Sequence, residues 1–394
     1  MGLFDLHNSS SNHTCPGPKN ADGPTIQPVV GSFTAHGLFV IVSGATALFA
    51  GLLTIFLLIR HATHYSCPRE QKQIIRIITI VPSFAIVSFL CVWLDGSPNL
   101  YIAPGRDVGE AFPMAAFFLL MTAYIAPNEQ SQDDCFAQLA LLDKKGNELG
   151  GGSLVWFHKL AFMVVQWLPI SIILWIATAI SLAVGTYCVD SNSIHFAHIW
   201  ITILRMISTG LAIIAILRFY TRSKPLLKSR GTLKQLICFK AIVFLNFVQT
   251  FIFSFLRSSG ALHPSKYFTL NDLSNGLPSL ILCCEMAPIA LFFFVAYPVK
   301  PYSRKGDQWY HGGPLGCYAI LQALNPVDIV IELLQGVRAK FHRDGGYTSV
   351  VAPHASYDGP GYAEPPQYGQ YANHEYEMRN EQTPRVKAHH NGQY

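Results

Sequence analysis

The chain has 394 residues, of which 51% are hydrophobic and only 13% are charged. Soluble domains carry about 25% charged residues, so this composition excludes a soluble enzyme, a coiled coil or a disordered chain as the whole protein. The net charge of +5 is modest and the cations stand beside apolar runs, which argues for membrane orientation and not for nucleic-acid binding. The sequence therefore predicts a protein that crosses a membrane several times.

Seven stretches are long and apolar enough to cross a bilayer, which takes about 20 residues in a helix. They lie near residues 35–59, 74–94, 108–126, 160–184, 195–219, 236–257 and 277–297. Backbone polar groups inside lipid find no water to bond, so runs of this length are predicted to be helices. The expected fold class is all-α, with a seven-helix transmembrane bundle over residues 35–300.

Loop charge predicts the orientation of this bundle. The first connector carries Arg60, Arg69 and Lys72, and the fifth connector carries six cations over residues 218–234 without an acid. Loops rich in Lys and Arg stay cytoplasmic. Both connectors follow odd-numbered spans, so we expect residues 1–34 to lie outside and the C-terminus to be cytoplasmic. Glycosylation acceptors at Asn8 and Asn12 agree with an outer N-terminal segment.

The part that follows the bundle divides into a juxtamembrane segment, 301–342, and a tail, 343–394. Residues 326–341 place apolar side chains at helical spacing. This pattern predicts an amphipathic helix that either rests on the inner leaflet or packs on the cytoplasmic loops. The tail has too few aliphatic residues to bury a core, and it is predicted to be a disordered cytoplasmic segment.

A short motif in this tail has the form of a ligand for WW domains. Pro365, Pro366 and Tyr368 make up a P-P-x-Y sequence, and such motifs dock as a short polyproline helix with an aromatic anchor. One hypothesis is that it recruits a WW-domain ubiquitin ligase. The other is a chance match in a segment rich in Pro and Tyr.

Polar residues inside the predicted spans are the candidate site, because an ionisable group at a helix centre costs about 2.5–3.5 kcal/mol on insertion scales. Arg205, Gln249 and Glu285 each lie about eight residues, or roughly 12 Å, below the outer surface. We therefore expect Arg205 and Glu285 to be partners, with Asn246 on the face of Gln249. Lys240 lies near the cytoplasmic end of its span. These residues either meet a solute or hold the helices in register.

Other chemistry finds less support in the sequence. Two histidine pairs have i, i+3 spacing but no third ligand nearby, so no metal site is predicted: His61 with His64, and His195 with His198. Motifs of serine hydrolases, zinc proteases and phosphate-binding loops are missing from the sequence, so neither an enzyme nor a cofactor is expected. Cys15 and Cys188 are both expected outside, and a disulfide between them is left open.

Three blocks of residues carry a resemblance to a known family. The first runs from His61-Ala-Thr-His-Tyr65 through Pro68 and Gln71 to Arg76-Ile77 and Pro82, the second from Phe239-Lys240 to Asn246 and Gln249, and the third is Cys284-Glu285-Met286. Together they resemble the organic solute transporter alpha / transmembrane protein 184 family over residues 35–300. A departure is Gly109, which precedes Glu110 where that family usually has tyrosine.

The resemblance implies seven spans with an outward N-terminus and facilitated movement of amphipathic solutes such as steroid conjugates. In some members it also implies a single-span partner subunit, while others are linked to membrane trafficking. Transferred to this sequence, its motif residues are Lys240, Gln249 and Glu285, with Gln71 and Arg76 near the inner mouth.

The leading interpretation is a transporter that moves a steroid-like or lipid-like organic solute down its gradient, with Arg205, Gln249 and Glu285 at the polar end of the solute. One alternative is a receptor-like or trafficking scaffold whose tail recruits cytoplasmic partners. Another is a membrane-embedded enzyme that acts on a lipophilic metabolite through Glu285. Expected partners are membrane lipids and either a single-span subunit or a second copy, in the plasma membrane or an endosomal or vacuolar membrane.

Overall fold

The computed structural model describes residue 15 and residues 25–341, apart from 95, 127–131, 140–151, 190, 192 and 304–309. The predicted glycosylation acceptors Asn8 and Asn12 lie outside the described residues, as do Pro365, Pro366 and Tyr368 of the tail motif. Within the described part, the regular structure is helical and the only bridge between extended residues joins Val30 and Phe33.

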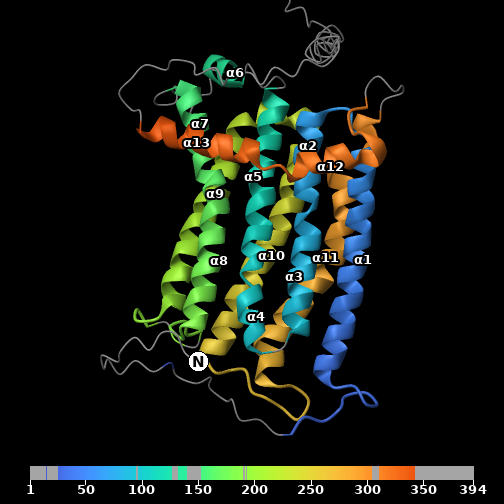
Figure 1. Ribbon diagram of the computed structural model, residues 1–394, viewed down its shortest axis with the longest axis vertical. Coiled ribbons are helices and arrows are strands. Elements are labelled where there is room, and N and C mark those ends of the chain that lie inside the picture. The colour runs from blue at the N-terminus through green and yellow to red at the C-terminus, as the bar shows by residue number, and fades with distance from the viewer. Residues whose placement is uncertain are drawn as a thin grey trace, which may run out of the picture. The chain divides into compact units, whose positions relative to one another are not determined.

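Seven of the helical segments that are long and apolar enough to cross a membrane run side by side along the long axis of the molecule (Figure 1). Four are single helices: α1 (Ala35–Thr63), α9 (Ala197–Leu227), α10 (Thr232–Ser258) and α11 (Leu277–Ala296). The other three are pairs: α2 (Pro68–Ile78) with α3 (Ile80–Trp93), α4 (Ser97–Ile102) with α5 (Gly105–Ile125), and α7 (Gly152–Val165) with α8 (Trp167–Ala183). Each predicted window coincides with one crossing, so the prediction of a helical multi-pass protein is confirmed.

Prolines explain why three crossings are divided. A proline lacks the N–H group and its ring clashes with the carbonyl four residues earlier. Accordingly, α2 gives way to α3 at Thr79, just before Pro82, and α7 gives way to α8 at Gln166, just before Pro169. Pro104 stands at the N-cap of α5. The crossings continue through these breaks because packing against neighbouring helices holds both halves in place.

The α4–α5 crossing is the most central helix of the bundle. In its most apolar stretch 72% of the residues are buried, against 28% for α9 and for α10 and 17% for α1. Phe117 of α5 stacks on Phe239 of α10, and Phe118 packs against Phe219 of α9. The peripheral helices leave many Leu, Ile and Phe side chains exposed. In a membrane protein this is the surface that lipid covers.

The two ends of the bundle differ in chemistry. At one end α1 finishes, α2 begins and α9 turns into α10, so both cation-rich connectors lie there; it is called the basic end. At the opposite end Cys15 and Cys188 form a disulfide with a Cα–Cα distance of 5.7 Å, which confirms the option left open by the sequence. Which side of the membrane each end faces stays a prediction.

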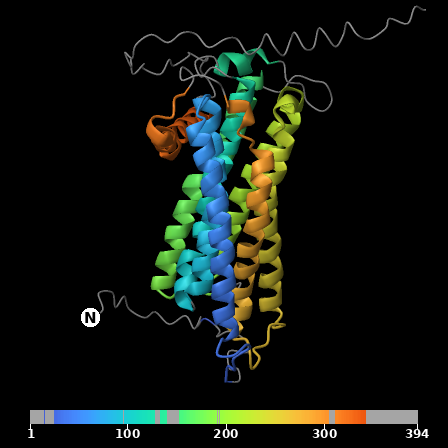
Figure 2. The same ribbon diagram turned by 90° about the vertical axis from the view of Figure 1, so that its right-hand side faces the viewer.

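By length and composition eight segments qualify as candidate crossings, one more than predicted. The eighth, Pro314–Gln335, is interrupted: α12 (Cys317–Leu324) ends at Asn325, whose backbone is extended, and α13 (Val327–Phe341) begins after Pro326. Both helices lie across the bundle near the basic end, on one side of it (Figures 1 and 2). We call α12 and α13 together the belt. The predicted helix over 326–341 is confirmed as α13.

A further short helix was not expected from the sequence. α6 (Gln132–Gln138) lies in the connector between the third and fourth crossings and packs on α7. Its Phe136 is fully buried and stacks on Phe157 at 4.2 Å between ring centroids. Phe136 also approaches Phe219, so this helix closes the basic end between α7 and α9 with an aromatic cluster.

Candidate functional site

A mostly apolar pocket lies between α9 and α10. Its walls are Ile213, Ile216 and Leu217 of α9, and Leu236, Phe239, Lys240 and Val243 of α10. The space exists because the two consecutive helices lean on different neighbours: α9 packs on α7 and α8, whereas α10 packs on α11. Since Ile213, Leu217 and Lys240 are partly exposed, the pocket reaches the surface of the bundle.

Lys240 is the charged group of this pocket. It lies eight residues into α10, or about 12 Å from the basic end of that helix. Among the described residues, the ion pairs do not include Lys240. Lys240 lines the pocket with the carbon atoms of its side chain, so the lining itself is apolar.

Gln249 and Glu285 form a second polar feature, farther from the basic end. Gln249 follows Val243 by six residues, or about 9 Å along α10. Its side chain lies within electrostatic range of Glu285 on α11. Nevertheless, Gln249 Nε2 and Glu285 Oε2 are shielded from solvent without a hydrogen-bond partner. Asn246 lies one turn before Gln249 and is partly buried. Gln249 and Glu285 are nevertheless hydrogen-bonding neighbours across the contact of α10 with α11, and both atoms are buried there.

The expected partnership of Arg205 with Glu285 is wrong. Arg205 Nε lies 2.9 Å from Oδ2 of Asp107, at the start of α5. Asp107 was not among the candidate residues because the predicted third window begins at residue 108. α5 packs on α9 directly, so Asp107 meets Arg205 across that contact. Glu110, one turn deeper, interacts with both residues; it is 4% exposed and its Oε1 has no hydrogen-bond partner.

Gln71, expected near an inner mouth, is fully buried and joins the end of α1 to the start of α2. Its Oε1 accepts hydrogen bonds from the backbone N–H groups of Ser66 and Cys67, at 2.7 and 2.9 Å. Its Nε2 donates to the carbonyls of His61 and His64, at 3.3 and 2.9 Å. One amide therefore satisfies four backbone groups of the α1–α2 turn.

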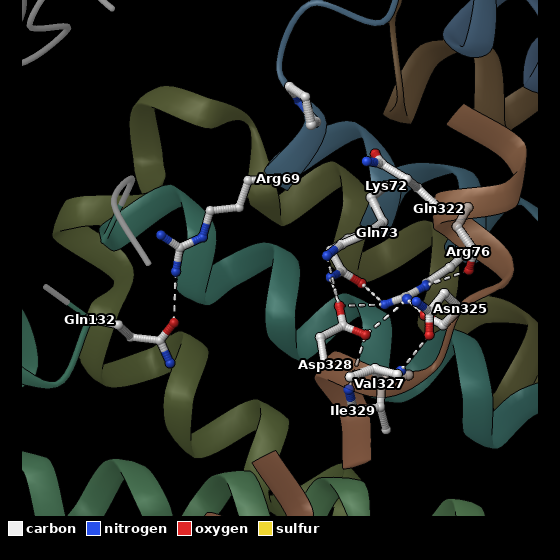
Figure 3. Close-up of polar contacts among 12 residues, drawn as sticks. Arg69, Lys72, Gln73, Arg76, Gln132, Gln322, Asn325, Val327, Asp328 and Ile329 are labelled. Atoms are coloured by element: carbon white, nitrogen blue, oxygen red, sulfur yellow. Dashed lines mark hydrogen bonds and ion pairs between the residues drawn. The ribbon is translucent and has the colours of Figure 1, made fainter. Parts of the chain in front are cut away.

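Arg76, the other residue expected near an inner mouth, holds the belt against α2 (Figure 3). It is 1% exposed and makes a bidentate pair with Asp328 of α13, at 2.8 and 2.9 Å. Its Nε donates to the carbonyl of Ala323, and its Nη2 donates to that of Asn325. The guanidinium nitrogens thus bond the belt and its own helix, and the group also lies over the ring of Phe112 of α5.

The carboxylate of Asp328 is further supported from α2. Gln73 Nε2 donates to Oδ2 at 2.9 Å, and Lys72 Nζ lies 3.1 Å from the same oxygen (Figure 3). Burial alone would raise the pKa of Asp328, but hydrogen bonds and charge from Arg76, with Lys72 and Gln73, hold this pKa at about 2. The carboxylate therefore stays ionised near neutral pH.

A bridge at the basic end escaped sequence reasoning. Arg230, in the turn between α9 and α10, lies 3.3 Å from Glu70 of α2 and over the ring of Tyr124 of α5. The hydroxyl of Tyr302, beyond α11, donates to the other oxygen of Glu70 at 2.8 Å. In the sequence Arg230 is one of six similar cations, so no local signal distinguishes it.

Known proteins resemble most of this chain. A sequence model described as organic solute transporter Ostalpha matches residues 39–302. Protein LAZ1 of Arabidopsis thaliana is 26% identical over 320 residues, or 75% of this chain and 65% of LAZ1. A transmembrane protein 184 homolog of Dictyostelium discoideum is 25% identical over 288 residues, or 69% of this chain and 52% of that protein.

The chain thus spans between about half and two thirds of the length of these relatives. No solved structure matches it. The matched range contains the seven crossings and the pocket between α9 and α10, whereas the belt lies beyond it. Because the family match covers well over half of the sequence, the chain belongs to the organic solute transporter Ostalpha family.

Proposed function

We propose that the protein is a membrane transporter that lets amphipathic organic solutes, steroid-like or lipid-like, cross along the pocket between α9 and α10. The observation that carries this proposal is the pocket itself, which is lined by six apolar residues and one lysine. The pocket has room for about one water molecule, so α9 and α10 would separate to admit the body of such a solute, and the ammonium group of Lys240 would then meet an anionic or polar head. Membership of a transporter-like family supports the same function.

The packing of the bundle favours a path at its surface over one through its centre. Phe118, Phe136, Phe157 and Phe219 are fully buried and stack on one another between α5, α7 and α9 at the basic end. A solute as wide as a steroid would have to displace this cluster to pass through the middle. The pocket between α9 and α10 reaches the bundle surface, so an apolar body can remain in contact with lipid there.

The polar end of the solute would then move from one group of polar side chains to another. Lys240 is the first of them from the basic end, and Gln249 with Glu285 is the second, about 14 Å along α10 from Lys240. The unmet atoms of Gln249 and Glu285 can bond a hydroxyl or amide group of the solute. The sequence holds no ATP-binding loop, and the proposed drive is either the gradient of the solute or an ion.

The test is solute uptake by liposomes that contain the purified full-length chain, across sterols, conjugated steroids and amphipathic anions. Val243→Trp fills the pocket and should abolish uptake of whichever solute the natural chain transports. The matched control is Ile237→Trp, on the same helix but 52% exposed. Uptake that survives in Val243→Trp would contradict a path through this pocket.

Two further variants separate the remaining alternatives. Lys240→Gln should reduce uptake of anionic solutes more than uptake of uncharged sterols, since it removes only the charge. A chain that ends at residue 342 should keep its uptake, because a transporter core does not depend on the tail. A scaffold that acts through the tail would instead lose its cellular effect in that truncated chain.

A further inference from the structure

The belt packs on the bundle through small and branched apolar residues. Ala319 and Ala323 of α12 are buried against α1 and α2, next to Ala62 and Ile75. Ile329 of α13 is buried against α5 and α7, next to Ala115, Leu119 and Val165, and Leu333 packs beside it. The belt is thus a packed part of the fold, held against α1, α2, α5 and α7.

The polar side chains of the belt also point toward the bundle. Asp328 pairs with Arg76, Gln322 accepts a hydrogen bond from the hydroxyl of Tyr65, and Glu332 accepts one from Gln132 of α6. A helix on the surface of a soluble protein does the reverse, with its polar side in water. The belt therefore turns its polar side inward.

Its outer side is a continuous apolar face. Seven large side chains there are between 47% and 66% exposed: Tyr318, Leu321 and Leu324 of α12, and Val327, Val330, Ile331 and Leu334 of α13. Fully burying one such side chain stabilises by about 1.5–3 kcal/mol, so leaving seven of them half exposed to water would be costly. An apolar medium must cover this face.

The depth of the belt identifies that medium. Val165, which contacts Ile329, lies five residues inside the apolar window that begins at residue 160, or about 8 Å along the helix. Interfacial amphipathic helices bury their apolar face about 5–10 Å into the boundary between headgroups and acyl chains. Figure 1 shows the belt running across the bundle, and Figure 2 shows it on one side near the same end, so its residues share a similar depth.

The apolar face also continues the lipid-covered surface of the bundle. α12 packs next to the last turns of α1, where Ile55, Phe56 and Ile59 are 47–55% exposed. These residues belong to the first crossing and face acyl chains. The apolar face of the belt therefore lies near an apolar part of α1, whose last turn also exposes Arg60, over the ring of Phe56.

From these observations we infer that the belt is an interfacial membrane element: acyl chains of the leaflet at the basic end cover its apolar face, and the Arg76–Asp328 pair fixes it to α2. Within the described residues, Asp328 is the carboxylate that pairs with the buried Arg76. If the belt left the bundle, Arg76 would therefore remain buried without its carboxylate partner. A change in lipid packing around the belt would thus act on α2 through this ion pair.

The test measures the depth of the belt in the full-length chain, reconstituted in vesicles at a high ratio of lipid to protein. Nitroxide labels are placed on Leu321→Cys and, separately, on Ile331→Cys, in a background that carries Cys317→Ser. Collision with oxygen, which concentrates in lipid, is compared with collision with a water-soluble nickel complex. Both positions are exposed, so labelling them does not disturb the packing.

We expect oxygen to dominate at both belt positions, as at the lipid-facing reference Phe251→Cys on α10, which is 66% exposed in the natural chain. The aqueous reference is Asp134→Cys on α6, where the nickel complex should dominate. Dominance of nickel at 321 and 331 would place the face in water and overturn the inference. Low collision with both reagents would also overturn it, because it would show that a protein surface covers the belt. Neither result depends on whether the chain transports a solute.

Discussion

Two polar residues at the basic end have hydrogen-bond partners for nearly all of their polar atoms. Two others, in the middle of the membrane, keep polar atoms without one. Gln71 and Arg76 are fully buried, and each makes at least four hydrogen bonds to the backbone or to other side chains. Gln249 and Glu285 lie within range of each other but keep unpartnered atoms. The family resemblance named all four as motif residues. The hydrogen bonds of Gln71 and Arg76 brace the helices, whereas a contact of Gln249 and Glu285 with a solute belongs to the proposed function.

This contrast has a physical basis. A buried polar atom without a partner costs about 1–3 kcal/mol, so a protein keeps such atoms only where something else compensates. Substitutions at the basic end should therefore lower stability, and substitutions at Gln249 or Glu285 should affect solute movement more than stability. The predictions below separate these two outcomes.

The largest effect is expected for Asp328→Ala. It leaves Arg76 buried without the carboxylate that pairs with it, and breaking a buried ion pair in this way costs about 3–5 kcal/mol. The measurement is the free energy of unfolding in detergent from denaturant titration. Asp134→Ala, at an exposed position on α6, is the control and should change little.

The double variant Arg76→Met with Asp328→Leu sharpens this first prediction. It removes both charges and should recover most of the lost stability, because well-packed apolar residues often replace a buried ion pair at little cost. A loss under about 1 kcal/mol in Asp328→Ala would show that the belt is not needed to satisfy Arg76.

A smaller loss is expected for Gln71→Ala. The truncation removes four hydrogen bonds from the α1–α2 turn, but water can reach part of that turn because His64 is exposed. We expect a loss of about 2–3 kcal/mol. Gln71→Glu retains an acceptor for the two N–H groups and cannot donate to the two carbonyls, so its loss should be about half as large. Equal stability of all three chains would contradict a bracing role.

A still smaller effect is expected for Arg230→Ala. The Arg230 side chain is 38% exposed, and exposed ion pairs contribute about 0–1 kcal/mol, less at high salt. Its loss should therefore fall below 1 kcal/mol and shrink as salt is added. Lys228→Ala, two residues away and also exposed, is the matched control. A large loss that salt does not change would show that the bridge to Glu70 behaves as a buried pair.

The crossings and α13 could be predicted from the sequence because their signals are local. A run of about 20 apolar residues, or apolar side chains at helical spacing, is contained in one segment. The partner of Arg205 could not be predicted in the same way. Asp107 lies just outside the third predicted window, and only the packing of α5 on α9 brings it to Arg205.

The pocket was missed for a related reason. Its wall residues, such as Ile213 and Val243, are of the same types as residues that face lipid elsewhere on α9 and α10. What distinguishes them is that the two helices lean on different neighbours, which is a property of the assembled bundle. The prediction of Lys240 as a site residue came from the family resemblance, and the structure places it in that pocket.

The smallest effect on stability is expected for Glu285→Gln, which makes it the sharpest probe of the open pair. Glutamine has nearly the same shape, and Oε2 of Glu285 has no hydrogen-bond partner to lose, so the free energy of unfolding should change by less than about 0.5 kcal/mol. If Glu285 contacts the solute, uptake by liposomes should still fall at least about tenfold, which corresponds to about 1.4 kcal/mol. A chain that loses stability while each folded molecule transports normally would instead assign Glu285 to the bracing of α10 against α11.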